Sequence, residues 1–153
     1  MAPQLPTRKL GKNGPEITAL GFGLMGLSAY YGKPESDELR FKVLDRALEL
    51  GETFWDSADA YQDSEILVGK WFKRTGKRNE IFLATKFANK LITDEHGQIT
   101  GRTVDSTPEY CKEACEKSLK RLGIETIDLY YCHRVDRKTP IEKTVQAMVE
   151  LKK

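Results

Sequence analysis

The feature of the sequence that most constrains the fold is an alternation of short apolar runs and amphipathic helical runs, repeated four times. Consecutive parallel strands need a long crossover, usually a helix, so this alternation predicts a parallel sheet with right-handed crossovers. The sequence therefore predicts an α/β fold. The expected strands are residues 19–23, 53–57, 81–86 and 126–132, each followed by an expected helix.

Typical capping residues mark where the expected helices begin. Ser36 precedes two acidic residues and then apolar residues at helical spacing, and a second helical pattern begins near Ser64. Thr107 precedes a proline, which is common at the first helical position. Thr139, with Glu142 three residues later, has the spacing of a capping box. We therefore expect helices to start at these four places.

Three connecting segments carry other patterns. Asn13-Gly14 lies between two extended runs and predicts a small N-terminal β-hairpin. Residues 25–34 and 87–106 contain glycines and polar residues without a helical or strand period, so both are expected to be loops. A loop as long as the second is uncommon unless it has a function or is mobile.

Charge and hydrophobicity exclude two classes of partner. The 25 basic and 23 acidic residues leave a net charge of +2 without a dense basic cluster, which argues against nucleic acid as a main partner. No apolar run approaches the ~20 residues of a membrane-spanning helix, and residues 1–6 lack the apolar core of a secretory signal. We expect a globular protein that binds neither nucleic acid nor membrane.

The three cysteines, Cys111, Cys115 and Cys132, are an odd number without the spacing of a disulfide framework. This favours reduced thiols and a cytoplasmic location. Cys111 and Cys115 are one helical turn apart, which makes a metal pair conceivable, but small core residues are the favoured interpretation. No metal site is predicted.

Four polar residues lie at or just beyond the ends of three expected strands: Asp56, Tyr61, Lys86 and His133. The carboxyl ends of parallel strands share one edge of the sheet, where α/β proteins place their functional residues, so these side chains are expected to meet. Each also has an ordinary explanation. Tyr61 could be a half-buried aromatic residue, Lys86 an exposed charge, Asp56 a turn cap and His133 a core histidine.

Together these side chains suit proton transfer to a carbonyl oxygen. A free phenol has a pKa near 10 and is a weak proton donor at neutral pH, but a neighbouring ammonium favours the phenolate. In this hypothesis Tyr61 is the proton donor, Lys86 supplies the ammonium, and Asp56 pairs with Lys86. His133 would hydrogen-bond the carbonyl oxygen and orient it towards Tyr61.

The stretches that contain these residues resemble the aldo-keto reductase superfamily, from about Arg8 to the end of the chain. The matching segments are Gly21-Phe22-Gly23-Leu24-Met25-Gly26, Trp55-Asp56-Ser57-Ala58-Asp59-Ala60-Tyr61, Ala84-Thr85-Lys86 and Leu129-Tyr130-Tyr131-Cys132-His133. The resemblance implies a (β/α)8 barrel that reduces small aldehydes or ketones with NADPH. It also implies that Asp56, Tyr61, Lys86 and His133 are the catalytic residues.

The resemblance further implies a cofactor-binding set of Gly23, Leu24, Met25 and Asp56. The apolar Leu24 and Met25 would lie against the nicotinamide end of NADP(H), and Phe87 with the loop after it would wall the substrate site. Gly21-Phe22-Gly23 is not interpreted as a dinucleotide fingerprint, although Gly26 completes the G-x-G-x-x-G spacing. These glycines are instead expected to permit close backbone approach beside the barrel mouth.

A whole barrel of this type takes about 250 residues, and the 153-residue chain offers four of its eight strand–helix units. Residues 1–153 are therefore expected to be the N-terminal half of one barrel domain, ending before the fifth strand. Later loops of the family hold the adenosine phosphates and set the substrate and the NADP preference. Open sheet edges would favour self-association.

Three explanations of this length stay open: a fragment of a longer protein, two copies that complete a barrel, or an open sheet with another role. The uninterrupted last helix favours the fragment. The main functional hypothesis is carbonyl reduction by the full-length form. The alternatives are a non-catalytic cofactor-binding protein similar to the family's channel-associated subunits, and an inactive truncated product.

Overall fold

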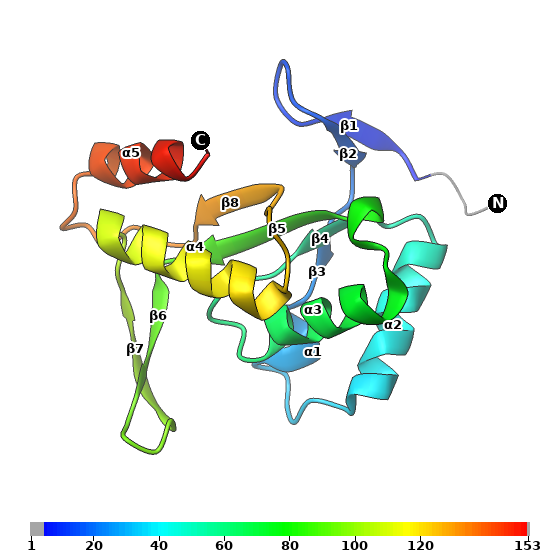
Figure 1. The fold of residues 1–153 in the computed structure, drawn as a ribbon, viewed down its shortest axis with the longest axis horizontal. Coiled ribbons are helices and arrows are strands. Elements are labelled where there is room, and N and C mark those ends of the chain that lie inside the picture. The colour runs from blue at the N-terminus through cyan, green and yellow to red at the C-terminus, as the bar shows by residue number, and fades with distance from the viewer. Residues whose placement is uncertain (1–4, 153) are drawn as a thin grey trace.

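The computed structural model describes residues 5–152, and its centre is a sheet of four parallel strands (Figure 1). The strands follow the order β3-β4-β5-β8 and span Phe22–Gly23, Phe54–Asp56, Phe82–Phe87 and Leu129–Cys132. The predicted α/β fold is confirmed. The predictions for residues 1–4 and 153, at the two ends of the expected domain, lie outside the described residues.

The helices alternate with the strands of this sheet. α1 (Met25–Ser28) and α2 (Asp37–Glu49) follow β3, α3 (Ser64–Thr75) follows β4, α4 (Pro108–Leu122) follows β5, and α5 (Ile141–Leu151) follows β8. A short 3-10 helix, η1 (Arg78–Glu80), leads into β5. The larger helices pack in chain order, α2 with α3, α3 with α4 and α4 with α5. This is the arrangement of half a (β/α)8 barrel. Within residues 5–152, no helix is long and apolar enough to span a membrane.

Three of the four predicted helix starts are confirmed. The side chain of Ser36 accepts a hydrogen bond from the Leu39 amide, and that of Thr107 accepts one from the Tyr110 amide; α3 begins at Ser64. The capping box at Thr139 is wrong. The Thr139 hydroxyl and amide both bond to the Asp136 carboxylate, which draws this residue into the preceding turn and leaves the start of α5 without a side-chain cap.

The main core lies between the sheet and helices α2 and α3. Trp55 of β4 and Trp71 of α3 are fully buried with ring centroids 4.8 Å apart, and Leu24, Leu67 and Leu83 are packed in the same cluster. Each indole nitrogen also has an acceptor, the Glu52 carbonyl for Trp55 and the Asp45 carboxylate for Trp71. A second cluster, containing Phe87, Cys111 and Ala147, joins β5 to α4 and α5.

The first strand is shorter than predicted. Only Phe22 and Gly23 pair with β4, because the Ala19 amide is bonded to the Pro6 carbonyl and Leu20 is 73% exposed. Residues 25–28, predicted as loop, form the single turn of α1. Close backbone approach applies to Gly21, where an added Cβ would lie 3.0 Å from the Phe54 ring, but an added Cβ at Gly23 would meet nothing within 4 Å.

Two antiparallel hairpins flank the parallel sheet. The predicted N-terminal hairpin is confirmed as β1 (Thr7–Lys9) paired with β2 (Glu16–Thr18). The predicted long loop is wrong, because residues 89–104 form a second hairpin of β6 (Asn89–Thr93) and β7 (Ile99–Val104). Its strands are largely exposed, so their sequence lacks the alternation by which a half-buried strand is recognised.

Candidate active site

The structure brings the four predicted catalytic residues to one end of the parallel sheet. Asp56 is the last residue of β4, Lys86 lies in β5, and His133 directly follows β8. The His133 amide donates to the Phe87 carbonyl at 2.8 Å and so continues the pairing of β5 with β8. Tyr61 lies in the turn before α3, where its carbonyl accepts from the Ser64 amide. Four separate segments therefore converge at the carboxyl ends of the strands.

The ammonium of Lys86 is the centre of the cluster. Its Nζ lies 3.1 Å from Tyr61 Oη, 3.0 Å from Asp56 Oδ2 and 2.7 Å from the Ser57 carbonyl oxygen. An ammonium has three N–H donors, so these three acceptors match its full capacity. The residue is 5% exposed, which leaves it little freedom to turn towards water. Lys86 is therefore held in place beside the hydroxyl of Tyr61.

His133 completes the cluster as a neutral imidazole. Its ring meets the Tyr61 ring edge-on, with centroids 5.7 Å apart at 85°. Burial, reinforced by the charge of Lys86, lowers the pKa of His133 below 6.5. Its Nδ1 is buried and has no hydrogen-bond partner within residues 5–152. A neutral ring carries one N–H, which is a donor suited to an uncharged carbonyl oxygen.

The predicted cofactor-binding residues differ in accessibility. Gly23 is exposed and Met25 is half-buried, so both can contact a ligand at the end of the sheet. Leu24 is fully buried in the main core, and its amide donates to the Asp56 carbonyl at 3.0 Å. The predicted contact of the Leu24 side chain with nicotinamide is therefore not supported, because the core already surrounds that side chain.

Sequence reasoning missed Tyr131. Its hydroxyl donates to Asp56 Oδ1 at 2.7 Å, opposite the oxygen that pairs with Lys86. Tyr130 and Tyr131 are adjacent, and strand alternation shows only that they face opposite sides of the sheet. The signal that could have selected Tyr131 is its spacing of two residues from His133, which places both on one face.

Asp59 was also missed, and it is the most perturbed carboxyl beside the cluster. Burial raises its pKa to about 7, although the Tyr110 hydroxyl donates to Oδ2 at 3.1 Å. Among residues 5–152, no group hydrogen-bonds to its buried Oδ1. Its backbone amide is bonded to the Lys86 carbonyl, but its side chain is directed to α4. Asp59 therefore supports the loop that carries Tyr61 and takes no direct part in the cluster.

Replacing Asp59 with Asn is expected to stabilise the protein at alkaline pH. Between pH 3.8 and about 7 the folded chain keeps a proton that the unfolded chain releases, so the stability of the wild type falls as the pH rises through this window. Asn is uncharged and can still accept from Tyr110. Urea unfolding should show a gain of about 1–2 kcal/mol near pH 8 and almost none near pH 4. An equal gain at both pH values would contradict the assigned burial of the charge.

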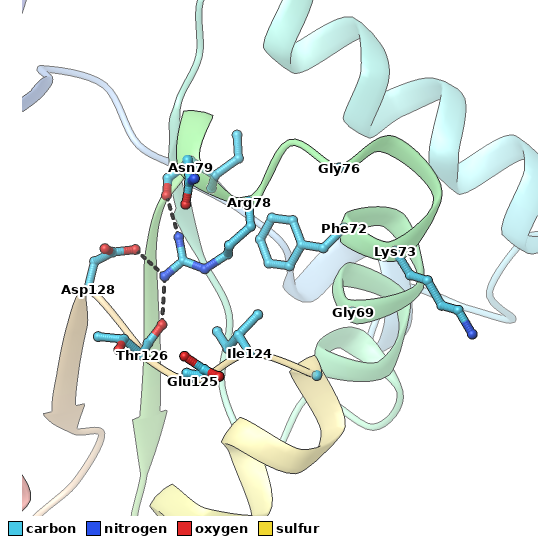
Figure 2. A pocket seen from close by; sticks show the side chains of 12 residues that line it. Gly69, Phe72, Lys73, Gly76, Arg78, Asn79, Ile124, Glu125, Thr126 and Asp128 are labelled. Carbon is cyan, nitrogen blue, oxygen red and sulfur yellow. Dashed lines mark hydrogen bonds and ion pairs between the residues drawn. The ribbon is translucent and has the colours of Figure 1, made fainter.

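A hollow of about 720 Å³ lies at the end of the sheet opposite the cluster, where β5 and β8 begin (Figure 2). Its Arg78 donates to the backbone oxygens of Ile81 and Thr126 and to the carboxylate of Asp128. Asp128 also accepts from the Leu83 amide. The guanidinium is engaged by the protein itself, so we assign it to joining the starts of these two strands.

The site residues lie in a region that matches known proteins. The sequence model of the Aldo/keto reductase family matches residues 19–153. Aldo-keto reductase str7 of Strobilurus tenacellus is 55% identical over 97% of this chain, and aldo-keto reductase yakc, NADP(+), of Schizosaccharomyces pombe is 49% identical over 94%. The chain spans 42% and 41% of the lengths of these two relatives.

A solved structure shows the same likeness in three dimensions. The holo form of aldo-keto reductase AKR11C1 from Bacillus halodurans matches with a TM-score of 0.82 at 37% identity. The match covers 97% of this chain and 47% of that one. The backbone arrangement described above is thus the arrangement of about half of a known enzyme-family fold.

Proposed function

Because the chain belongs to the aldo-keto reductase family, we propose that it carries the proton-donating site of an NADPH-dependent reductase of small aldehydes or ketones. The observation that carries this proposal is the position of the Lys86 ammonium, 3.1 Å from the Tyr61 hydroxyl and 3.0 Å from the Asp56 carboxylate. The name of the fission yeast relative, which includes NADP(+), supports the choice of cofactor.

Tyr61 is the proton donor in this proposal. Its Oη would give a proton to the carbonyl oxygen as that oxygen gains negative charge, a transfer of the kind that contributes about 10²–10⁴-fold to a rate. The fixed ammonium of Lys86 stabilises the negative charge left on Tyr61 without reorganisation during the reaction. His133, neutral and edge-on to the Tyr61 ring, would donate to the same carbonyl oxygen and hold it in line.

The residues at the end of β3 fit a bound nicotinamide. Gly23 is exposed, and an added Cβ there would meet no protein atom within 4 Å, so a ligand can approach its backbone. Met25 presents a half-buried apolar side chain beside it. The carboxylate of Asp56 is already engaged by Lys86 and Tyr131, so its effect on the cofactor would be indirect. When bound, NADPH supplies the hydride.

The proposal is tested by carbonyl-dependent oxidation of NADPH over a panel of small aldehydes and ketones, with NADH compared at equal concentration. The chain should be assayed alone and fused to the C-terminal remainder of the Strobilurus relative, because it spans 42% of that protein. Turnover of the fusion with a preference for NADPH is expected. Tight NADPH binding without turnover would instead support the non-catalytic alternative, and absence of both would contradict the proposal.

We further propose that the chain by itself pairs with a second copy. Within residues 5–152, β3 and β8 each have one edge without a strand partner, and both strands run in the same direction. Two copies related by a twofold axis could therefore pair β3 with β8 twice and close eight parallel strands. An apolar groove of about 600 Å³ runs beside β3, and α5 exposes the apolar residues Ile141, Val145 and Val149.

Replacing Leu20 with Lys is expected to weaken this pairing at least about tenfold, because it places a charge in the apolar groove. Leu20 lines the groove and is 73% exposed, so the change should cost the monomer little stability. Sedimentation equilibrium measures the dissociation constant. Tyr31→Lys, at a residue that is 76% exposed and outside the groove, is the matched control. A wild-type chain that stays monomeric would refute the pairing.

The cysteines lead us to propose a cytoplasmic location. Cys111 and Cys115 are buried on α4, and burial raises the pKa of the Cys111 thiol to about 12. A thiol that stays protonated is a poor nucleophile and a poor metal ligand, so it serves as a small core residue. Buried cysteines that stay unpaired in the core suit a reducing compartment.

A further inference from the structure

We infer, building on the proposed function, that Tyr131 is a positioning residue of the site. Its hydroxyl holds one oxygen of Asp56 so that the other oxygen holds Lys86 beside Tyr61. The chain of contacts is short and continuous: Tyr131 Oη to Asp56 Oδ1 at 2.7 Å, Asp56 Oδ2 to Lys86 Nζ at 3.0 Å, and Nζ to Tyr61 Oη at 3.1 Å.

The position of Tyr131 follows from strand register. Tyr131 of β8 lies directly opposite Lys86 of β5, so the two side chains project from the same face of the sheet. The Lys86 Nζ is 5.5 Å from the Tyr131 ring centre. Asp56 comes from β4, on the other side of β5, so the hydroxyl of Tyr131 spans from one neighbour of β5 to the other.

Asp56 needs this support because it is the more accessible member of the Asp56–Lys86 ion pair. Its side chain is 30% exposed, whereas that of Lys86 is 6% exposed. Water could compete for an exposed carboxylate oxygen and allow the group to rotate away from Lys86. With each oxygen bonded to a different partner, both the position and the rotation of the carboxylate are fixed.

The two tyrosines of the site have different partners and therefore different roles. The hydroxyl oxygen of Tyr61 accepts a hydrogen bond from the Lys86 ammonium, whereas the hydroxyl of Tyr131 donates one to the Asp56 carboxylate. Burial and the charge of Asp56 both raise the pKa of Tyr131 above its ordinary value. Tyr131 thus remains protonated and acts as a permanent donor, and it does not compete with Tyr61 for the proton transfer.

The adjacent Tyr130 offers a matched control. It faces the other side of β8, where its hydroxyl donates to the Cys111 carbonyl at 3.0 Å and its ring stacks on Phe87. Tyr130→Phe therefore removes a hydroxyl and a partly buried hydrogen bond from the same strand without contact to the site. If the role of Tyr131 were purely structural, Tyr131→Phe and Tyr130→Phe would have similar effects on activity.

The first test compares Tyr131→Phe with Tyr130→Phe in the carbonyl reductase assay. Tyr131→Phe is expected to lower kcat roughly tenfold, since it removes a hydrogen bond to a charged group, with the KM for NADPH within about twofold of wild type. The pH at which kcat is half-maximal should move in this variant alone. An unchanged kcat and pH profile in Tyr131→Phe, with Tyr61→Phe inactive, would overturn the positioning role and leave the proposed function intact.

The second test does not require turnover. Limiting acetic anhydride acetylates lysines according to their accessibility, and peptide mass spectrometry reports each site. Acetylation of Lys86 should rise several-fold in Tyr131→Phe and stay at the wild-type level in Tyr130→Phe, with the exposed Lys70 as internal reference. Equal Lys86 labelling in both variants would overturn the inference, even if the protein showed no reductase activity at all.

Discussion

Tyr61→Phe should lower kcat for carbonyl reduction by about 10²–10⁴-fold while leaving the fold intact. The substitution removes one oxygen atom, the atom that lies 3.1 Å from Lys86 Nζ and is the proposed proton donor. The aromatic ring remains to fill its buried place against His133. Binding of NADPH should therefore stay within about twofold of wild type, because no proposed cofactor contact is lost. Single-turnover kinetics and a fluorescence titration measure the two quantities separately.

The matched control for this prediction is Tyr31→Phe. It makes the same chemical change at a tyrosine that is 76% exposed, so activity should be unchanged. Circular dichroism should give the same spectrum for both variants. If Tyr61→Phe retained turnover close to that of wild type, another group would have to supply the proton, and the role assigned to Tyr61 would be wrong.

Arg121→Met is expected to destabilise the protein by about 3–5 kcal/mol, because it leaves a buried carboxylate without its cation. Glu65 is 1% exposed and accepts from Arg121 Nε at 2.7 Å and from the Thr85 hydroxyl at 2.7 Å. These contacts join α3, α4 and β5 behind the site. A loss of this size is a large part of the stability of a typical domain. Urea unfolding at neutral pH measures it.

The same helix provides the control for this ion pair. Lys117 of α4 pairs with Glu113, and both side chains are about half exposed, so Lys117→Met should leave the unfolding midpoint unchanged. The double variant Glu65→Leu with Arg121→Met should recover most of the lost stability, since it removes the buried charge together with its partner. Equal effects of Arg121→Met and Lys117→Met would contradict the burial assigned to Glu65.

Local patterns predicted most of the regular structure. Ser36 and Thr107 cap helices because their side-chain oxygens accept hydrogen bonds from amides three residues ahead. Such signals depend only on neighbouring residues. They failed at Thr139, whose hydroxyl donates to the Asp136 carboxylate instead of capping α5, and in the β6–β7 hairpin, whose exposed strands show no apolar alternation.

Four members of the candidate site and the pairing of Asp56 with Lys86 were predicted from the sequence, but Tyr131 and the burial of Asp59 were not. Asp56, Lys86 and His133 lie at or next to the ends of β4, β5 and β8, and parallel topology brings strand ends together. Asp59 looked like one more residue of the motif around Tyr61, yet its side chain is directed to Tyr110 of α4 and its pKa is raised to about 7 by burial. Burial is a property of the packed molecule, so no local pattern reports it.

The alternation of the parallel strands with the larger helices, and the end of the sheet where the four polar side chains meet, were determined by the sequence by itself, because periodicity, caps and chain direction are local properties. Only the tertiary structure decided which oxygen of Asp56 meets Lys86 and which meets Tyr131. Asp56 and Tyr131 are 75 residues apart in the chain, and their hydrogen bond depends on the register of β4, β5 and β8. Register is set by the packing of all the strands and helices together, so the spacing of Tyr131 from His133 did not by itself reveal the contact of Tyr131 with Asp56.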